Sequence, residues 1–103
     1  MQVSGRFGFS VKLTNNHLFI GYPGFQMKGE VQVFVRESNN WVLGQTLTDS
    51  SEEKELFFGA SLGAKGDRLV IGNFNGEKVF TFDLDNNNHF KKSALLAPEN
   101  LPG

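Results

Sequence analysis

The sequence contains two copies of one pattern, about fifty residues apart. Residues 7–11 (FGFSV) return as residues 58–62 (FGASL), 51 positions later, since 58 − 7 = 51. Residues 17–21 (HLFIG) return as residues 68–72 (RLVIG) at the same offset. A period of this length is typical of repeat architectures, in which one unit buries its apolar faces only by stacking on a neighbour.

The later part of each copy repeats at a slightly shorter offset. VQVF at residues 31–34 returns as VFTF at residues 79–82, and 79 − 31 = 48. Trp41 is matched by Phe90, at an offset of 49. About three residues are therefore missing from a loop of the second copy.

Each copy predicts four short strands separated by glycine- and asparagine-rich turns. We divide the chain into a first unit, residues 1–50, and a second unit, residues 51–103, with a linker at residues 48–57. The expected strands are residues 7–13, 18–20, 30–36 and 41–47 in the first unit and residues 58–64, 69–72, 78–84 and 90–96 in the second.

The distribution of apolar residues within the strands indicates how the sheets pack. Val31, Val33 and Val35 share one face of their strand, whereas residues 18–20 and 69–71 are apolar without alternation. A strand that is apolar on both faces is expected to be covered on both. Four-stranded antiparallel blades stacked as in a β-propeller meet this requirement. A single two-sheet sandwich is the alternative, and it predicts one polar face per strand.

Composition excludes several classes of protein. The net charge of −1 offers no basic face for nucleic acid or an anionic membrane. There is no cysteine, so disulfides and thiolate metal sites are excluded. No apolar run approaches the roughly 20 residues of a membrane span, and residues 1–6 lack the apolar region of a signal peptide.

The order Phe-Gly-x-Ser, a turn, and an apolar strand ending in Ile-Gly resembles the FG-GAP repeat, the blade unit of integrin α-subunit propellers. The matching residues are Phe7, Gly8, Ser10, Ile20, Gly21 and Pro23 in the first copy and Phe58, Gly59, Ser61, Ile71 and Gly72 in the second. The resemblance implies a non-enzymatic binding or adhesion module for a protein or glycan, outside the cell or on its surface. A structural spacer within a larger surface protein is the alternative.

Many repeats of this family carry a calcium loop before the second strand. Here the corresponding residues 13–17 hold no carboxylate, and residues 63–67 hold only Asp67. Calcium requires several clustered oxygen ligands. The chain therefore resembles the metal-free variant, and we expect no metal and no cofactor.

Two blades are fewer than the roughly four to eight of a closed propeller. The sequence ends shortly before a third Phe-Gly pair would be due. We expect further blades, supplied either by the same polypeptide or by other copies of the chain as a homo-oligomer.

Residues 59–63 match the Gly-x-Ser-x-Gly nucleophile elbow of hydrolases. An acidic residue (Asp67, Asp83 or Asp85) and then His89 follow in the order of a hydrolase triad. The elbow requires a strand that turns into a helix, whereas the residues after Ser61 predict another strand. A hydrolase is therefore the weaker hypothesis, and we expect no catalytic residue.

Several polar motifs are interpreted as surface turns. Residues 83–88 begin like a calcium loop but lack its glycine and its final acidic residue. Residues 65–67 (KGD) resemble an adhesion tripeptide, although Gly66 suits a turn. Residues 52–55 are a charged run of the linker. His17 and His89 have no second histidine nearby in sequence, so neither is expected to bind metal.

Two kinds of segment are candidates for contact with a partner. Trp41 and Phe90 hold matched repeat positions, which favours packing between blades over ligand binding. The loops at residues 22–29 and 73–77 are the better candidates for ligand recognition, because loops on a rigid scaffold commonly carry function.

Overall fold

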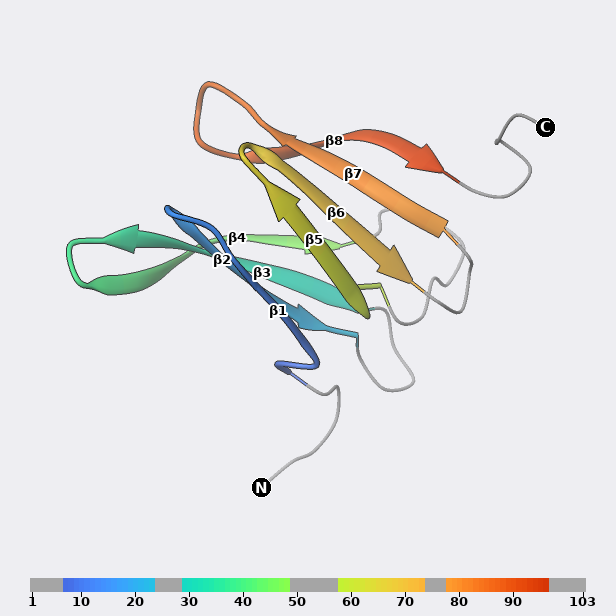
Figure 1. Cartoon of the computed structure of the whole chain (residues 1–103), viewed down its shortest axis with the longest axis horizontal. Coiled ribbons are helices and arrows are strands. Elements are labelled where there is room, and N and C mark those ends of the chain that lie inside the picture. The colour runs from blue at the N-terminus through green and yellow to red at the C-terminus, as the bar shows by residue number, and fades with distance from the viewer. Residues whose placement is uncertain (1–6, 24–28, 49–57, 74–77, 97–103) are drawn as a thin grey trace.

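The computed structural model describes residues 7–23, 29–48, 58–73 and 78–96, and this part of the chain is all-β (Figure 1). It forms two four-stranded antiparallel sheets, as the sequence predicts. The first sheet contains β1 (Ser10–Leu13), β2 (His17–Tyr22), β3 (Glu30–Glu37) and β4 (Asn40–Thr48), and the second contains β5 (Ser61–Lys65), β6 (Arg68–Asn73), β7 (Lys78–Leu84) and β8 (Phe90–Leu96).

The two sheets repeat one another in order and in register. Each is a meander whose strands pair with their neighbours in the chain, in the manner of a propeller blade. Ser10 lies opposite Gly21 in the first sheet, and Ser61 lies opposite Gly72 in the second. The last strand pair of each sheet is irregular at the matching point, between Val33 and Phe34 and between Thr81 and Phe82. The duplication in sequence is therefore a duplication of structure.

The expected starts of β1 and β5, at residues 7 and 58, are wrong by three residues. Gly8 and Gly59 adopt positive φ angles of 85° and 94°, which turn the chain before each strand begins. Such angles are favourable for glycine and disfavoured for other residues. The Phe-Gly pairs thus form turns at the strand entrances.

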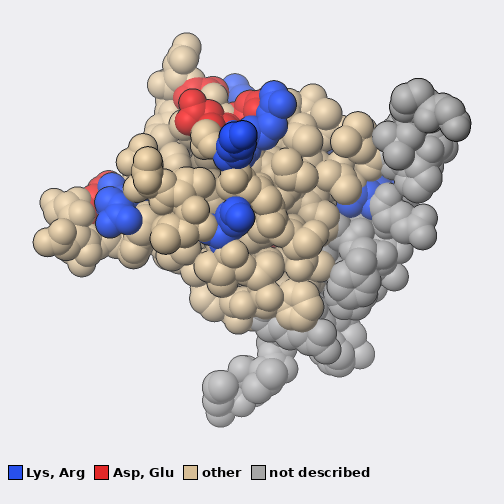
Figure 2. All heavy atoms as spheres, in the orientation of Figure 1, with Lys and Arg blue, Asp and Glu red and all other residues tan. Residues whose placement is uncertain are grey.

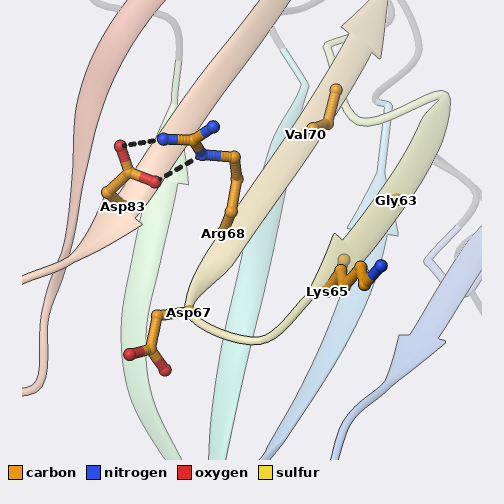
Figure 3. A pocket seen from close by; sticks show the side chains of 7 residues that line it. Gly63, Lys65, Asp67, Arg68, Val70 and Asp83 are labelled. Atoms are coloured by element: carbon orange, nitrogen blue, oxygen red, sulfur yellow. Dashed lines mark hydrogen bonds and ion pairs between the residues drawn. The ribbon is translucent and has the colours of Figure 1, made fainter.

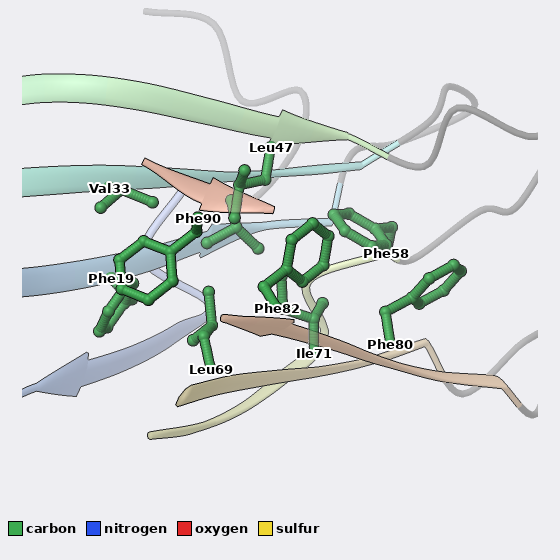
Figure 4. Close-up of a cluster of buried hydrophobic side chains, with 10 residues drawn as sticks. Phe19, Val33, Leu47, Phe58, Leu69, Ile71, Phe80, Phe82 and Phe90 are labelled. Atoms are coloured by element: carbon green, nitrogen blue, oxygen red, sulfur yellow. The ribbon is translucent and has the colours of Figure 1, made fainter. Parts of the chain in front are cut away.

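The core lies between the two sheets, whose inner faces meet (Figure 4). Its largest fully buried side chains include Phe19 from the first sheet and Phe80 from the second, together with Phe58 before β5. The ring of Phe58 meets that of Phe80 edge-on, with centroids 5.2 Å apart. The buried apolar residues are Phe19, Val31, Val33, Leu47, Phe58, Leu69, Ile71, Phe80, Phe82 and Phe90.

Within these two sheets, β2 and β6 are fully covered on one face only. Along β2 the burial alternates: Phe19 and Gly21 are buried, whereas Leu18 and Ile20 are only half-buried. The same holds in β6, where Val70 is half-buried between two buried residues. Two stacked sheets cover only the faces turned toward each other. Each sheet therefore keeps an apolar or partly apolar outer face.

Polar contacts also link the sheets. The Ser10 hydroxyl donates to the Gly59 carbonyl at 2.8 Å. The Gln45 side chain forms two hydrogen bonds of 2.8 Å with the backbone of Phe90, donating to its carbonyl and accepting from its N–H. We call this contact between the two sheets, with its Ser10 and Gln45 bonds, the internal joint. It holds the two blades as one body.

Candidate functional site

The outward side of the first sheet, which we call the first outer face, carries an apolar row that crosses all four strands, beside polar residues of β3 such as Gln32 and Arg36. The strand register aligns Leu13, Leu18, Phe34 and Leu43 in one row. Leu13 and Leu43 are 58% and 50% exposed, and Val11 beside this row is 57% exposed. Contiguous apolar surface of this kind marks interaction sites in soluble proteins.

Trp41 lies at the hairpin end of the first outer face, directly opposite Arg36 on β3. The Arg36 guanidinium carbon lies 4.4 Å from the centroid of the indole ring, a cation–π contact that orients the ring. Its repeat counterpart Phe90 is only 3% exposed and packs in the core. Packing between blades is thus confirmed for Phe90, whereas Trp41 is half-exposed on the side away from the second sheet.

The outward side of the second sheet, the second outer face, contains a shallow hollow of about 580 Å³ (Figure 3). The hollow is lined by Gly63, Ala64, Lys65, Asp67, Arg68, Val70 and Asp83. At its rim, Arg68 Nε donates to Asp83 Oδ1 at 2.7 Å, and this ion pair lowers the pKa of Asp83. The hollow therefore has a small apolar floor and a rim of both charges.

Charged side chains gather at one end of the molecule. Figure 2 shows them grouped over the end of the second sheet where β5 turns into β6, with a smaller group at the β3–β4 hairpin. Much of the remaining visible surface of the described residues is uncharged. Both signs are present in the larger group, so this surface favours neither a polyanion nor a polycation.

The residues of the suspected hydrolase triad are not brought together. Ser61 lies opposite Gly72, which in turn lies opposite Val79, whereas Asp83 is four residues further along β7. At about 3.3 Å per residue, Ser61 and Asp83 are separated by roughly 13 Å along the sheet. The chain after Ser61 continues as β5 into a hairpin, and the elbow's helix is not formed there.

The acidic turn after β7 is occupied by its own backbone. Asp85 Oδ1 accepts hydrogen bonds from the N–H groups of Asn87 and His89, at 2.8 and 3.0 Å, and these bonds lower the pKa of Asp85. Across the described residues, no group of three or more His, Asp or Glu side chains is placed to hold a metal ion. Asp85 is accordingly a turn-forming residue.

His17 belongs to the core, which sequence reasoning missed. It is 6% exposed, stacks on Phe19 with centroids 5.8 Å apart, and meets Phe90 edge-on at 5.1 Å. Burial lowers its pKa, while a hydrogen bond with the Asn88 side chain and the charge of Asp67 act in the opposite direction. Its position two residues before Phe19, on the same face of β2, was the available signal.

The remaining sequence candidates lie on turns or outside the described residues. Gly66 has a φ of 60°, as expected for the turn between β5 and β6, and Lys65 and Asp67 beside it are exposed. Residues 52–55, and most of the two candidate recognition loops, fall outside the part of the chain that the structure describes.

Within the described ranges, no helix is long and apolar enough to cross a membrane. Comparisons with protein-family models, with curated proteins and with solved structures returned no match for this chain.

Proposed function

We propose that this chain is a non-enzymatic protein-binding module, in which a rigid pair of propeller-like blades presents the first outer face to a protein partner. The observation that carries the proposal is the row of Leu13, Leu18, Phe34 and Leu43, which crosses all four strands; Leu13 and Leu43 are exposed, and the two residues between them are half-buried. Burying such a surface against a partner contributes favourable free energy in proportion to its apolar area.

The sequence pattern supports the same class of function. The resemblance to FG-GAP repeats favours a binding or adhesion role outside the cell or on its surface, and loops at residues 22–29 and 73–77 would add contacts to a protein or glycan ligand. The rigid internal joint favours such a role, because pre-organised surfaces lose little entropy on binding.

The test is a binding screen of the labelled chain against arrays of immobilised proteins, which include the unlabelled chain itself, and of immobilised glycans. Leu43→Lys places a charge on the first outer face, while Val42→Lys places the same charge on the opposite side of β4. Both positions are exposed, at 50% and 42%, so both variants are expected to fold. We expect saturable binding to a protein that Leu43→Lys reduces at least about tenfold and Val42→Lys preserves.

Three results would contradict this proposal. If Leu43→Lys and Val42→Lys reduce binding equally, the first outer face is not the binding surface. The absence of any saturable ligand would favour the structural spacer. An esterase activity of the wild-type chain that is lost in Ser61→Ala would support the hydrolase hypothesis instead.

A further inference from the structure

We infer that the partner of the first outer face is the second outer face of another copy of this chain, and that Trp41 of one copy enters the hollow at Arg68 and Val70 of the next. This inference rests on the proposed function and names its partner. In the internal joint, the inner face of the first sheet packs on the inner face of the second. Because the two sheets are repeats, the residues equivalent to these two surfaces occur a second time, one set on each outer face. The inference follows from pairing these two outer faces in the same way.

The first outer face reproduces the surface that the second sheet uses inside the joint. Residues on the inner face of the second sheet pack on the first sheet. Most of their counterparts, taken at the repeat offsets, are apolar and turned outward, whereas the counterpart of Phe80 is the polar Gln32. The matched pairs are Leu62 with Val11, Ala64 with Leu13, Leu69 with Leu18, Ile71 with Ile20, Phe82 with Phe34 and Phe90 with Trp41. Six positions that are buried or partly buried in one blade are thus apolar and at least partly accessible in the other.

The sizes of the side chains at the two joints compensate for each other. In the internal joint, Phe90 packs edge-on against Phe19 with centroids 5.4 Å apart. The counterpart of Phe19 is Val70, and the smaller valine side chain leaves space that forms part of the hollow. The counterpart of Phe90 is Trp41, which is larger than phenylalanine. A larger ring therefore faces a larger space, as dense packing requires.

The charge at this position also suits an indole. The counterpart of His17, whose ring meets Phe90 in the internal joint, is Arg68 on the rim of the hollow. Trp41 is already stacked under Arg36 of its own sheet. Entry into the hollow would place its ring near a second guanidinium, an arrangement in which cation–π attraction strengthens as water is excluded.

The groups that form the Ser10–Gly59 hydrogen bond of the internal joint also have repeat counterparts, which lie apart from each other. Ser10 donates to the Gly59 carbonyl, and a Cβ on Gly21 would collide with both groups, so the joint requires this glycine. The counterparts Ser61 and Gly72 stand on the second outer face, where Ser61 is exposed. The counterpart of Gly59 is Gly8, which has the same positive φ, and an added Cβ there would meet nothing within 4 Å.

Association through these faces is expected to be weaker than the internal joint. Gln45, which binds both backbone groups of Phe90, has Ala94 as its counterpart, so two hydrogen bonds have no equivalent. The contact is also head-to-tail, because one copy uses its first sheet and the other its second. Such contacts close into rings or extend into filaments, and rings of roughly four to eight blades would hold two to four copies.

The first experiment is sedimentation velocity over a concentration series of the wild-type chain, with circular dichroism as a check of folding. Trp41→Ala removes the inserted ring from the first outer face. Gly72→Ala adds a methyl group that blocks the contact surface on the second outer face. Val42→Ala, the neighbour of Trp41 on the other side of β4, is the control. We expect reversible association of the wild type and the control, and a dissociation constant at least about thirtyfold higher for Trp41→Ala and Gly72→Ala.

Mixing the two defective variants tests the head-to-tail geometry. Each retains the half that the other lacks, so the mixture should form a heterodimer and nothing larger. Failure of the mixture to associate would overturn the inference, as would a wild-type chain that stays monomeric or a dissociation constant that neither variant changes.

These outcomes separate the inference from the proposed function. If the wild-type chain is monomeric but the array shows protein binding that Leu43→Lys abolishes, the first outer face binds a different protein, and only the inference is wrong. If neither association nor array binding is found, both are wrong.

Discussion

Replacing Gly21 by alanine should separate the two blades, and the same change at Gly72 should not. A Cβ at Gly21 would overlap the Ser10 hydroxyl and the Gly59 carbonyl, and the carbonyl belongs to the backbone of the turn that precedes β5 of the second sheet. At Gly72 the nearest atom would be the Ser61 hydroxyl at 2.5 Å, on a side chain that can rotate into solvent. The two glycines hold the same repeat position, so the comparison isolates the internal joint.

The magnitude follows from what the added methyl group displaces. Loss of the Ser10–Gly59 hydrogen bond, with its carbonyl left unpaired, costs about 1–3 kcal/mol. Overpacking against fixed backbone costs about 1–3 kcal/mol more. We therefore expect Gly21→Ala to lower the free energy of unfolding by about 2–6 kcal/mol, and Gly72→Ala to change it by less than about 0.5 kcal/mol.

The assay is urea denaturation of dilute protein, followed by far-UV circular dichroism. Any general preference of a strand for alanine over glycine affects both variants alike and cancels in the comparison. Equal destabilisation by the two variants, or a Gly21→Ala chain as stable as the wild type, would refute the reasoning that the blades meet through this glycine.

Two further predictions concern the same joint. Gln45→Ala should lower the free energy of unfolding by about 2–4 kcal/mol, because it leaves both backbone groups of the buried Phe90 unpaired. The matched change Ala94→Gln should be neutral. Equal free energies of unfolding for the two variants in urea denaturation would contradict this. The lowered pKa of His17 means that the native state binds fewer protons than the unfolded chain, so stability is complete above the unfolded pKa near 6.5 and falls as the pH decreases below it. Melting temperatures measured from about pH 7.5 to 5 should fall for the wild type and for His89→Gln and remain level for His17→Phe; a parallel fall in all three would assign the effect to other groups.

Much of this architecture could be predicted because the information is local or repeated. Asn15 and Gly66 lie in turns between strands, as their residue types suggest, and the alternation of Val31 with Val33 sets the buried face of β3. The duplicated Phe-Gly-x-Ser pattern predicted two equivalent four-stranded units. Strand starts were less accurate, because the positive φ of Gly8 and Gly59 depends on the turn that the whole chain adopts.

The candidate site was less accessible to such reasoning. Trp41 and Phe90 occupy the same position of the repeat, yet one is half-exposed and the other is core. The repeat in the sequence predicts the same environment for both residues. Their environments differ because the two sheets stack in one order, which covers the strand face of Phe90 and leaves that of Trp41 open. The same applies to His17, whose burial arises from an aromatic ring contributed by a strand more than seventy residues later.

The amino-acid sequence alone determined that the chain is all-β, that it consists of two copies of one unit, and that each strand has a defined set of residues on each face, because strand periodicity and turn chemistry act over a few residues. The tertiary structure decided which of those faces are covered. Two stacked sheets have four faces and bury only two, so the apolar row at Leu13 and the hollow at Val70 exist because of how the blades stack.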